Sequence, residues 1–421
     1  MQTVVLAFSG GLDTSYCAVW LREVRGLRVV SVCVDTGGFD AAAREGVRAR
    51  ALECGVAEHH HIDARAHVFD DYVVPLVHGE VLRGGVYPVS VAAERTAQVE
   101  AVVRVAREVG AVAIAHGSTG AGNDQVRFDV AIAALAPDLE VLAPIRELSL
   151  SREQEASWLI ERGVPVSDDT VGYSLNAGLV GTTIGGRETH DSWALPPESV
   201  YTITCAPEAA PDVAEELVVG FEAGVPVSLD GVRLAGAALL EALNLRAGAH
   251  GVGRGLHVGD TILGVKGRIA FEAPAPLVLV QAHRELAKLV QTKWQNHWCR
   301  QLGEFYGMLL HEGLAFDPVM ADLKAFLRSA NQLLSGEVRV RLFKGAHTVV
   351  GVRSPHSLLD GKVAAYGEQA SAWTGAEAAG FARIHGIPSL LVARRAQASA
   401  GTAGVTSHET PTHTGSMEAP A

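Results

Sequence analysis

The chain has 421 residues, of which 48% are hydrophobic, so two or three domains with a large core are expected and global disorder is not. The formal net charge of −12, without a basic run in the part expected to fold, argues against a nucleic-acid surface. No apolar run approaches the roughly 20 residues of a membrane span. The residues after Met1 lack a charged signal-peptide region, and the five scattered cysteines form no Cys-x-x-Cys, so a cytoplasmic protein with reduced thiols is expected.

The first stretch of the chain predicts a strand, a tight turn and a helix. Residues 4–8 are apolar, residues 16–23 are amphipathic, and between them lies the run Ser9-Gly10-Gly11-Leu12-Asp13-Thr14-Ser15. Two glycines, three hydroxyl groups and the unpaired N–H groups of a helix start favour phosphate binding. Because the Asp13 carboxylate would repel phosphate, we expect Mg²⁺ between them. The alternative is an ordinary glycine-rich turn, since the run matches neither the Walker pattern nor Gly-x-Gly-x-x-Gly.

The next elements alternate between strand and helix. Strands are predicted at residues 27–34, 59–62, 111–115 and 141–145, and helices at 41–53, 68–82, 94–109 and after Ser151, where Gln154 completes a capping box. This alternation predicts a parallel, doubly wound sheet with right-handed crossovers. Ligands collect beyond the carboxyl ends of such strands, where the Ser9 loop and a turn at Asp35 are expected. We place the end of this domain near residue 166.

A second glycine-rich turn follows the strand predicted at 111–115. It spans residues 116–128 and places Asn123 or Asp124 at the cap of the next helix, with Arg127 one turn later on the same side. A capped helix with a surface arginine is the simpler interpretation. Two polar, glycine-rich turns at one edge of a sheet favour a shared ligand site instead.

The second half of the chain has a different pattern. Residues 173–193 are rich in Gly and Thr and are predicted to form a loop that reaches back over the first domain. Strands are predicted at 200–204, 216–221, 226–229, 261–263 and 277–280, helices at 239–243, 283–289, 291–310 and 374–385, and a hairpin at 338–352. Trp294, Trp298 and Phe305 are interpreted as core or subunit contacts. From residue 396 onward the composition predicts a disordered tail.

Several of these stretches together resemble the argininosuccinate synthase family, from residue 4 to about 388. They are Ser9 to Ser15, Ala115 to Gly120, Gly122 to Phe128, Gly220 to Pro226, His250 to Arg254 and Val350 to Pro355. The resemblance implies an α/β fold with a parallel, doubly wound, ATP-pyrophosphatase-type nucleotide-binding domain at 1–166. An α+β synthetase domain that binds the acceptor would follow at 167–362, then a C-terminal helical oligomerisation arm at 363–395 and the tail at 396–421. The family is typically a homotetramer.

The resemblance further implies a ligase that forms a C–N bond and depends on ATP and Mg²⁺. In the family, the ureido oxygen of citrulline attacks the α-phosphorus of ATP and pyrophosphate leaves. The amine of aspartate then displaces AMP. Because a urea carbonyl is a poor electrophile, adenylation supplies the leaving group, and catalysis is largely positioning and charge stabilisation.

The family's ATP and aspartate contacts are matched in this chain. The implied ATP contacts are Ala7, Phe8, Ser9, Gly10, Gly11, Leu12, Asp13, Thr14, Ser15, Val34 and Gly117. The implied aspartate contacts are Thr119, Asn123 and Asp124. Arg127 is implied to hold the citrulline carboxylate, to which a guanidinium can bind through two hydrogen bonds. Asp13 is the implied metal ligand, and Asp13, Asp124 and Arg127 are the implied catalytic residues.

The rest of the implied acceptor site departs from the family pattern. Tyr87 and Ser174 are kept, whereas a family serine becomes Thr183, another serine becomes Ala92, the glutamate that meets the citrulline amine becomes Gly259, and a tyrosine becomes Phe271. The family runs Ser-Leu-Ala-Arg-Pro and Asp-x-Asn read Ala92-Ala93-Glu94-Arg95-Thr96 and Asn176-Ala177-Gly178, and a lysine between two glycines reads Ala121. Each buried polar group left unpaired costs roughly 1–3 kcal/mol, so three such losses would cripple citrulline binding.

Two hypotheses follow from these departures. One is an enzyme that applies the same chemistry to a different, less polar acceptor in specialised metabolism. The other is a divergent argininosuccinate synthase in which Asp260 supplies the lost carboxylate and Thr183 the hydroxyl. A tRNA-modifying relative would need a basic face and a reactive cysteine pair, and the sequence has neither. A non-catalytic binding protein is disfavoured by the intact loop from Ser9 to Ser15.

Overall fold

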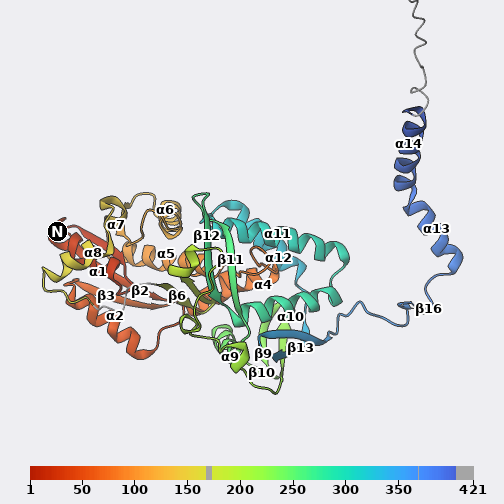
Figure 1. The fold of residues 1–421 in the computed structure, drawn as a ribbon, viewed down its shortest axis with the longest axis horizontal. Coiled ribbons are helices and arrows are strands. Elements are labelled where there is room, and N and C mark those ends of the chain that lie inside the picture. Colours follow the sequence, from red (N-terminus) through yellow and green to blue (C-terminus); the bar gives the residue numbers. More distant parts are fainter. Residues whose placement is uncertain (167–172, 368, 404–421) are drawn as a thin grey trace, which may run out of the picture. The chain divides into compact units, whose positions relative to one another are not determined.

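The computed structural model describes residues 1–166, 173–367 and 369–403. The chain divides into two compact units, Met1–Leu358 and Leu359–Ala421. Figure 1 shows the helices and strands of both.

A five-stranded parallel sheet forms the N-terminal part of the first unit, in the order β3-β2-β1-β4-β5. Its strands are β1 (Thr3–Ala7), β2 (Arg28–Asp35), β3 (Glu58–Asp63), β4 (Ala113–Ala115) and β5 (Glu140–Leu142). The chain winds from β1 through β2 to β3 on one side and continues with β4 and β5 on the other. The winding direction therefore reverses between β1 and β4, and ligands of such sheets bind in the crevice at that reversal. The prediction of a parallel, doubly wound sheet is confirmed (Figure 1).

Helices cover both faces of this sheet. They are α1 (Leu12–Glu23), α2 (Ala41–Glu53), α5 (Ser90–Glu108), α6 (Asp124–Leu135), α7 (Pro144–Leu148) and α8 (Arg152–Ile160). Between β3 and α5 the chain also forms α3 (Arg65–Val68), the π-helical turn η1 (Phe69–Val73) and α4 (Val74–His78), whose buried hydrophobic residues belong to the core of the second half. Val4 and Leu6 pack with α1, α2 and α8, whereas Val5 packs with α5 and α6 on the other face. Alternate residues of β1 are thus buried on opposite sides, which explains its uninterrupted apolar run. The capping box of Ser151 and Gln154 is confirmed.

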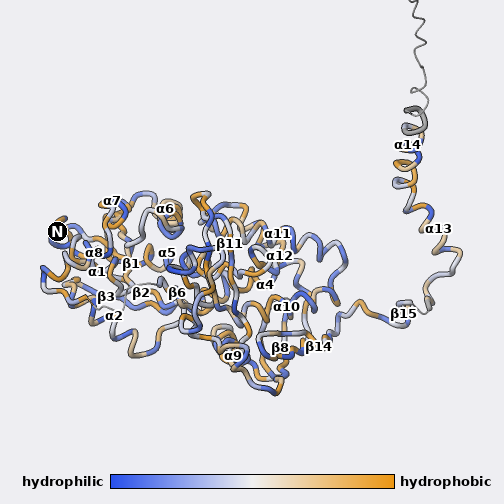
Figure 2. The backbone as a smooth tube through the Cα atoms, in the orientation of Figure 1, coloured by the Kyte–Doolittle hydropathy of each residue, from blue (hydrophilic) through white to orange (hydrophobic). Residues whose placement is uncertain are grey.

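Two antiparallel sheets follow, in the orders β10-β9-β8-β13-β14 and β11-β12-β7-β6. Their strands are β6 (Ser174–Gly178), β7 (Gly181–Gly185), β8 (Glu215–Glu222), β9 (Val225–Leu229), β10 (Val232–Arg233), β11 (Arg254–Asp260), β12 (Lys266–Glu272), β13 (Gly336–Phe343) and β14 (Ala346–Arg353). The helices here are α9 (Gly236–Ala249), α10 (Pro274–Val290), α11 (Lys293–His311) and α12 (Pro318–Ala330), with short 3₁₀ turns η3 (Arg187–His190), η4 (Glu198–Val200) and η5 (Pro207–Ala209). Residues of α9 to α12 share one hydrophobic core with β8, β9 and β13. Hydrophilic and hydrophobic residues mix along these helices, as expected of helices with one buried face (Figure 2).

Three segment predictions in the second half are wrong because pairing or periodicity outweighs local composition. Residues 173–193 contain the β6–β7 hairpin rather than a loop, since β7 is buried and pairs with β12. Residues 277–280 lie inside α10, whose buried residues recur with a helical rather than a strand period. Residues 261–263 lie in the turn that joins β11 to β12.

Residues 200–204 also form no strand. The backbone N–H groups of Thr202, Ile203 and Thr204 donate to the buried carboxylate of Glu272 at 2.8, 3.0 and 2.8 Å, in place of a neighbouring strand. A single side chain thus satisfies three backbone donors of an irregular segment. Helix α12 has no counterpart among the sequence predictions.

The second unit contains β15 (Ala364–Ala365), β16 (Gln369–Ala370), α13 (Gly375–His385) and α14 (Ile387–Ala403). Helix α14 passes the tail boundary predicted at residue 396, while residues 404–421 lie outside the described part. The predicted domain boundary at 166 adjoins residues 167–172, which also lie outside it, and stays a prediction. No helix of the described chain is long and apolar enough to cross a membrane.

Candidate active site

A cleft of about 990 Å³ opens where the loops after β1 and β4 face residues of β6, β7 and β11. Most residues singled out in the sequence line it: Ala7, Phe8, Ser9, Gly11, Leu12, Asp13, Thr14, Val34, Tyr87, Gly117, Thr119, Asn123, Asp124, Arg127, Ser174, Thr183 and Gly259. Four do not. Gly10 and Ser15 lie within the first loop and helix, and Ala92 and Phe271 are buried.

The first loop depends on Gly10 for its shape. This residue adopts a positive φ of 79°, and a Cβ added there would lie 3.3 Å from the Val47 side chain of α2. Helix α1 begins after Gly11 without a side-chain cap, so the first-turn N–H groups keep no side-chain acceptor within the described chain. The hydroxyl oxygens of Ser9 and Thr14 lie 3.2 Å apart in the same turn.

The loop after β4 lies directly against the first loop because β4 pairs with β1. A Cβ on Gly117 would lie 3.2 Å from the backbone nitrogen of Thr14 and 3.2 Å from the carbonyl carbon of Asp13. Gly120, three residues on, has its nearest neighbour at an ordinary 3.6 Å. Glycine at 117 therefore lets the two turns share one wall of the cleft.

Asp13 faces a second carboxylate, Glu155 of α8. Burial, followed by the charge of Asp13, raises the pKa of Glu155 to about 8. Within the described residues no cluster of three or more His, Cys, Asp or Glu side chains is placed to hold a metal ion. A single cleft-lining carboxylate fits Mg²⁺ where phosphate oxygens and water supply the other ligands, as is usual for Mg²⁺ with nucleotides. Asp13 fits the predicted metal role on that condition.

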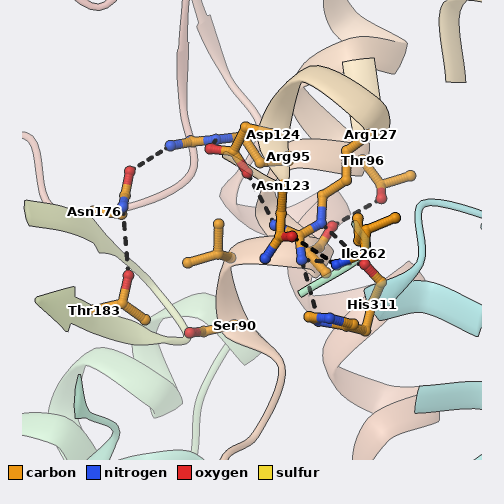
Figure 3. A network of polar contacts seen from close by, with 12 residues as sticks. Ser90, Arg95, Thr96, Asn123, Asp124, Arg127, Asn176, Thr183, Ile262 and His311 are labelled. Carbon is orange, nitrogen blue, oxygen red and sulfur yellow. Dashed lines mark hydrogen bonds and ion pairs between the residues drawn. The ribbon is translucent and has the colours of Figure 1, made fainter. Parts of the chain in front are cut away.

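Asp124, at the start of α6, is held between two arginines (Figure 3). Arg95 Nε donates to Oδ2 at 2.8 Å, and Arg127 Nη1 donates to Oδ1 at 2.9 Å. Burial opposes ionisation of Asp124, but the two guanidinium groups outweigh it and lower the pKa of this carboxyl. The predicted position of Arg127, one turn after Asp124 on the same side, is confirmed.

Other N–H groups of Arg127 bind His311 at the end of α11. Nε and Nη2 donate to the His311 carbonyl at 3.2 and 3.1 Å, and Nη2 also donates to ring atom Nδ1 at 3.2 Å. Burial, followed by the charge of Arg127, lowers the pKa of His311 to about 3, so the ring is neutral near pH 7. Arg127 is thereby fixed from both α6 and α11.

Asn123 occupies the N-cap position of α6, but its side chain does not cap the helix, contrary to one of the predictions. Its Oδ1 instead accepts a hydrogen bond from the N–H of Ile262, 2.8 Å away in the turn between β11 and β12 (Figure 3). Asn123 thus joins the second glycine-rich turn to the antiparallel part of the molecule.

The β6–β7 hairpin reaches the same network through Asn176. This residue accepts from Arg95 Nη2 at 2.5 Å and donates to the Thr183 hydroxyl at 3.4 Å (Figure 3). Below it, the buried Glu94 accepts from the N–H of Val180 at 3.0 Å. A Cβ on Gly178 would overlap the Glu94 carboxylate. The Glu94 carboxylate therefore lies in the volume that a side chain at position 178 would need, and both positions depart from the family pattern.

The hypothesis that Asp260 replaces the lost acidic contact is not supported. Its carboxylate pairs with Lys266 at 2.6 Å across the β11–β12 hairpin. The ring of His257 fills the space beside Gly259, since a Cβ at 259 would lie 2.6 Å from His257 Nε2. The acidic group expected from the family is thus absent at 259, and the carboxylate of Asp260, a residue that also lines the cleft, is paired with Lys266.

The aromatic pair formed by cleft-lining Tyr87 and buried Phe271 is less polar than the family pattern. Tyr87 and Phe271 pack with their ring centroids 5.4 Å apart. The Tyr87 hydroxyl is 3.1 Å from the hydroxyl of buried Ser90. Phe271 adds no polar atom.

The cleft-lining side chains that were missing from the site predicted from the sequence include Arg83, Arg95, His257 and His311. Arg95 stood in a run that was compared with the family but was not assigned a role. His311 carried no local signal, because it lies 184 residues from Arg127 in the chain.

The fold and the cleft define the class of protein. A doubly wound parallel sheet with a Ser-Gly-Gly loop at its winding reversal is a nucleotide-binding domain of the ATP-pyrophosphatase, or HUP, type, here joined to an antiparallel part that completes the cleft. Family models agree with this class. "Arginosuccinate synthase N-terminal HUP domain" matches residues 3–165, and "Arginosuccinate synthase C-terminal domain" matches residues 173–392.

Individual relatives match along nearly their whole length. The argininosuccinate synthase of Xanthomonas campestris pv. campestris is 42% identical over 398 residues, covering 93% of this chain and 98% of that protein. The argininosuccinate synthase of Pyrococcus furiosus is 40% identical over 388 residues, covering 92% and 93%. A solved NAD+ synthetase from Burkholderia pseudomallei is 14% identical with a TM-score of 0.27, over 40% of this chain and 61% of that one, which is too distant to carry an inference. The chain belongs to the argininosuccinate synthase family, whose members are ATP-using ligases that form C–N bonds.

Proposed function

We propose that this ligase joins the amine of aspartate to the carbonyl carbon of an acceptor and releases AMP and pyrophosphate. The acceptor carbonyl oxygen attacks the α-phosphorus of ATP, an O–P bond forms, and pyrophosphate leaves. The aspartate nitrogen then attacks the carbonyl carbon, the C–O bond breaks, and the oxygen departs on AMP. The nitrogen loses a proton to solvent in this second step.

One observation carries this proposal: both glycine-rich turns and the Asp124 cluster line the same cleft. Helix α1 and the hydroxyls of Ser9 and Thr14 offer hydrogen-bond donors to phosphate oxygens. Asp124, kept ionised by two arginines, suits the amine of aspartate, and Thr119 and Asn123 line the cleft beside it. The proposed ATP, aspartate and acceptor subsites are therefore close enough for two successive displacements.

Mg²⁺ bound with ATP would neutralise phosphate charge, and Asp13 is the residue that would hold it. The chain's own residues position the reactants. Gly117 allows the second loop to close against the first, and Arg127 offers a guanidinium to a carboxylate of the acceptor.

Two acceptors stay open under this proposal. Citrulline is the acceptor that membership of the family suggests. A different carbonyl compound is favoured by the cleft itself, because Gly259 offers no side-chain carboxylate and the Asp260 carboxylate pairs with Lys266. We therefore propose a non-citrulline acceptor for the same aspartate-ligating chemistry.

Oxygen labelling tests the reaction independently of the acceptor's identity. Citrulline and a panel of ureido acids, each carrying ¹⁸O in the carbonyl group, would be supplied with ATP, Mg²⁺ and aspartate. The label should appear in AMP and be absent from pyrophosphate. Formation of ADP and orthophosphate, or of AMP without the label, would refute the proposed chemistry.

We also propose a homotetramer. Trp294, Trp298 and Phe305 of α11 are 63%, 52% and 39% exposed, so a core role is wrong for the two tryptophans and the subunit-contact interpretation is left. Light scattering during gel filtration measures the mass directly, and a monomer would contradict the proposal.

A further inference from the structure

The end of the cleft around Gly259 carries the guanidinium group of Arg83. Arg83 lines it, with Nη2 donating to the Asp260 carbonyl at 2.6 Å and Nη1 lying 3.4 Å from His257 Nε2. Asp260 pairs with Lys266, and Asp124 pairs with two other arginines. Within the described residues Arg83 makes no direct ion pair, although the charges of Glu312 and Asp260 act on it from a greater distance and that of Arg127 opposes them.

Gly259 lies beside this guanidinium, where the His257 ring occupies the space that a side chain would need. A Cβ there would lie 3.3 Å from Arg83 Nη1, but also 2.6 Å from His257 Nε2. A side chain at 259 therefore requires movement of His257, whose ring stacks on Tyr87 with centroids 5.6 Å apart. Burial, followed by the charge of Arg83, lowers the pKa of His257, so this ring is neutral near pH 7 and balances no charge.

His311 lines the same end of the cleft, but its second ring nitrogen is not open to the cleft. Its Nδ1 accepts from Arg127, so the ring hydrogen resides on Nε2, which is buried. Burial lowers the pKa of His311, and hydrogen bonding to the Asp260 backbone opposes this with a smaller effect. The neutral ring therefore balances no charge beside Arg83.

We propose that this end of the cleft binds an anionic group of the acceptor, a carboxylate by preference, with Arg83 as its donor. The inference rests on the proposed function, which places the acceptor in this part of the cleft. An ammonium group beside Gly259 would meet the guanidinium of Arg83, with no glutamate at 259 to pair with it. The acceptor is therefore a ureido or amide compound with an additional carboxylate, rather than a free α-amino acid. It is more highly charged than the less polar acceptor expected from the sequence.

Three probes isolate this feature because they share one ureidopropyl chain. Citrulline carries an ammonium and a carboxylate on its α-carbon, 5-ureidopentanoate carries only the carboxylate, and 2-(3-ureidopropyl)malonate carries two carboxylates. Calorimetric titration into the full-length protein with α,β-methylene-ATP, Mg²⁺ and aspartate present measures their affinities without turnover. We expect the malonate to bind at least tenfold more tightly than the pentanoate, and citrulline to bind most weakly.

Three variants test whether Arg83 causes the expected differences in affinity. Arg83→Gln should weaken malonate binding by about ten- to a hundredfold and leave citrulline binding unchanged or tighter. Arg83→Lys keeps the charge and should retain most of the preference for the malonate. Arg233→Gln, on exposed β10, removes an equal charge outside the cleft and should change none of the three affinities.

The outcomes separate this inference from the proposed function. Tightest binding of citrulline, or failure of all three compounds to bind, would overturn the anionic acceptor site. An unchanged preference for the malonate in Arg83→Gln would show that Arg83 does not contribute to the anionic acceptor site. Labelled AMP formed from any acceptor supports the ligation chemistry whichever compound binds best.

Discussion

Replacing Glu94 with glutamine should remove a pH-dependent loss of stability. Glu94 is 2% exposed on α5, below the β6–β7 hairpin. Burial raises its pKa from 4.5 to about 8, and the N–H of Val180 and the charge of Arg95 offset only part of that effect. The folded protein therefore keeps this carboxyl protonated at pH values where the unfolded chain releases the proton.

The sign and size of the effect follow from linkage. Above pH 4.5 the unfolded state loses the proton and the folded state keeps it, so stability falls as pH rises and stops falling near pH 8. A difference of about 3.5 pH units, at roughly 1.4 kcal/mol each, corresponds to about 5 kcal/mol in total. Between about pH 5 and about pH 7.5 the expected share is about 3 kcal/mol.

Urea unfolding at these two pH values, followed by tryptophan fluorescence, measures the difference. Wild type should lose about 3 kcal/mol more than Glu94→Gln between them, because glutamine carries no titrating proton. Glu161→Gln, at an exposed carboxylate on the same half of the molecule, is the matched control and should follow wild type. Equal pH dependence in wild type and Glu94→Gln would refute the assignment of a buried, protonated Glu94.

Three further outcomes are expected. Asp124→Asn should lower aspartate incorporation by at least about a hundredfold, since it weakens two ion pairs. Affinity for an ATP analogue, measured by fluorescence titration, should stay within about twofold, and a parallel loss of nucleotide affinity would contradict Asp124 as an aspartate contact. Gly117→Ala should weaken ATP-analogue binding about tenfold by pushing the loops after β1 and β4 apart, whereas Gly120→Ala should have no effect. Equal affinities of the two variants for the analogue would count against a contact between these loops at Gly117. Asp13→Asn should raise the Mg²⁺ concentration needed for half-maximal pyrophosphate release at least about tenfold; an unchanged requirement would exclude Asp13 as the ligand.

The parallel half of the fold could be predicted because its signals are local. Apolar runs, glycine-rich turns and caps give strands and helices close to those at β1, β2 and α2. The antiparallel half could not be predicted equally well. The strand predicted at 200–204 fails because Glu272, about seventy residues later, binds its N–H groups. The β6–β7 hairpin was missed because its pairing with β12 outweighs a composition rich in Gly and Thr.

The candidate site likewise has residues that could be predicted from local sequence and residues that could not. Residues in the two glycine-rich turns could be selected because each turn is a short motif in the sequence. Pairing of the adjacent strands β1 and β4 then brings the two turns together. The partners that define the acceptor end, Arg83, His257 and His311, come from three separated segments. Spacing along the chain gives no sign that Arg127 contacts His311 or that Asp260 pairs with Lys266. Those contacts arise only from the tertiary fold.

The shared space of Glu94 and Gly178 constrains how this cleft arose. Set against the family runs, alanine at 94 and asparagine at 178 have both been replaced, and the glutamate fits only where the other residue lacks a side chain. An ancestor that acquired glutamate first would have forced two side chains into one volume, whereas glycine first left a small void. Glycine at 178 before glutamate at 94 is therefore the order that avoids this overlap. With both in place, a side chain restored at 178 alone requires the Glu94 carboxylate to move.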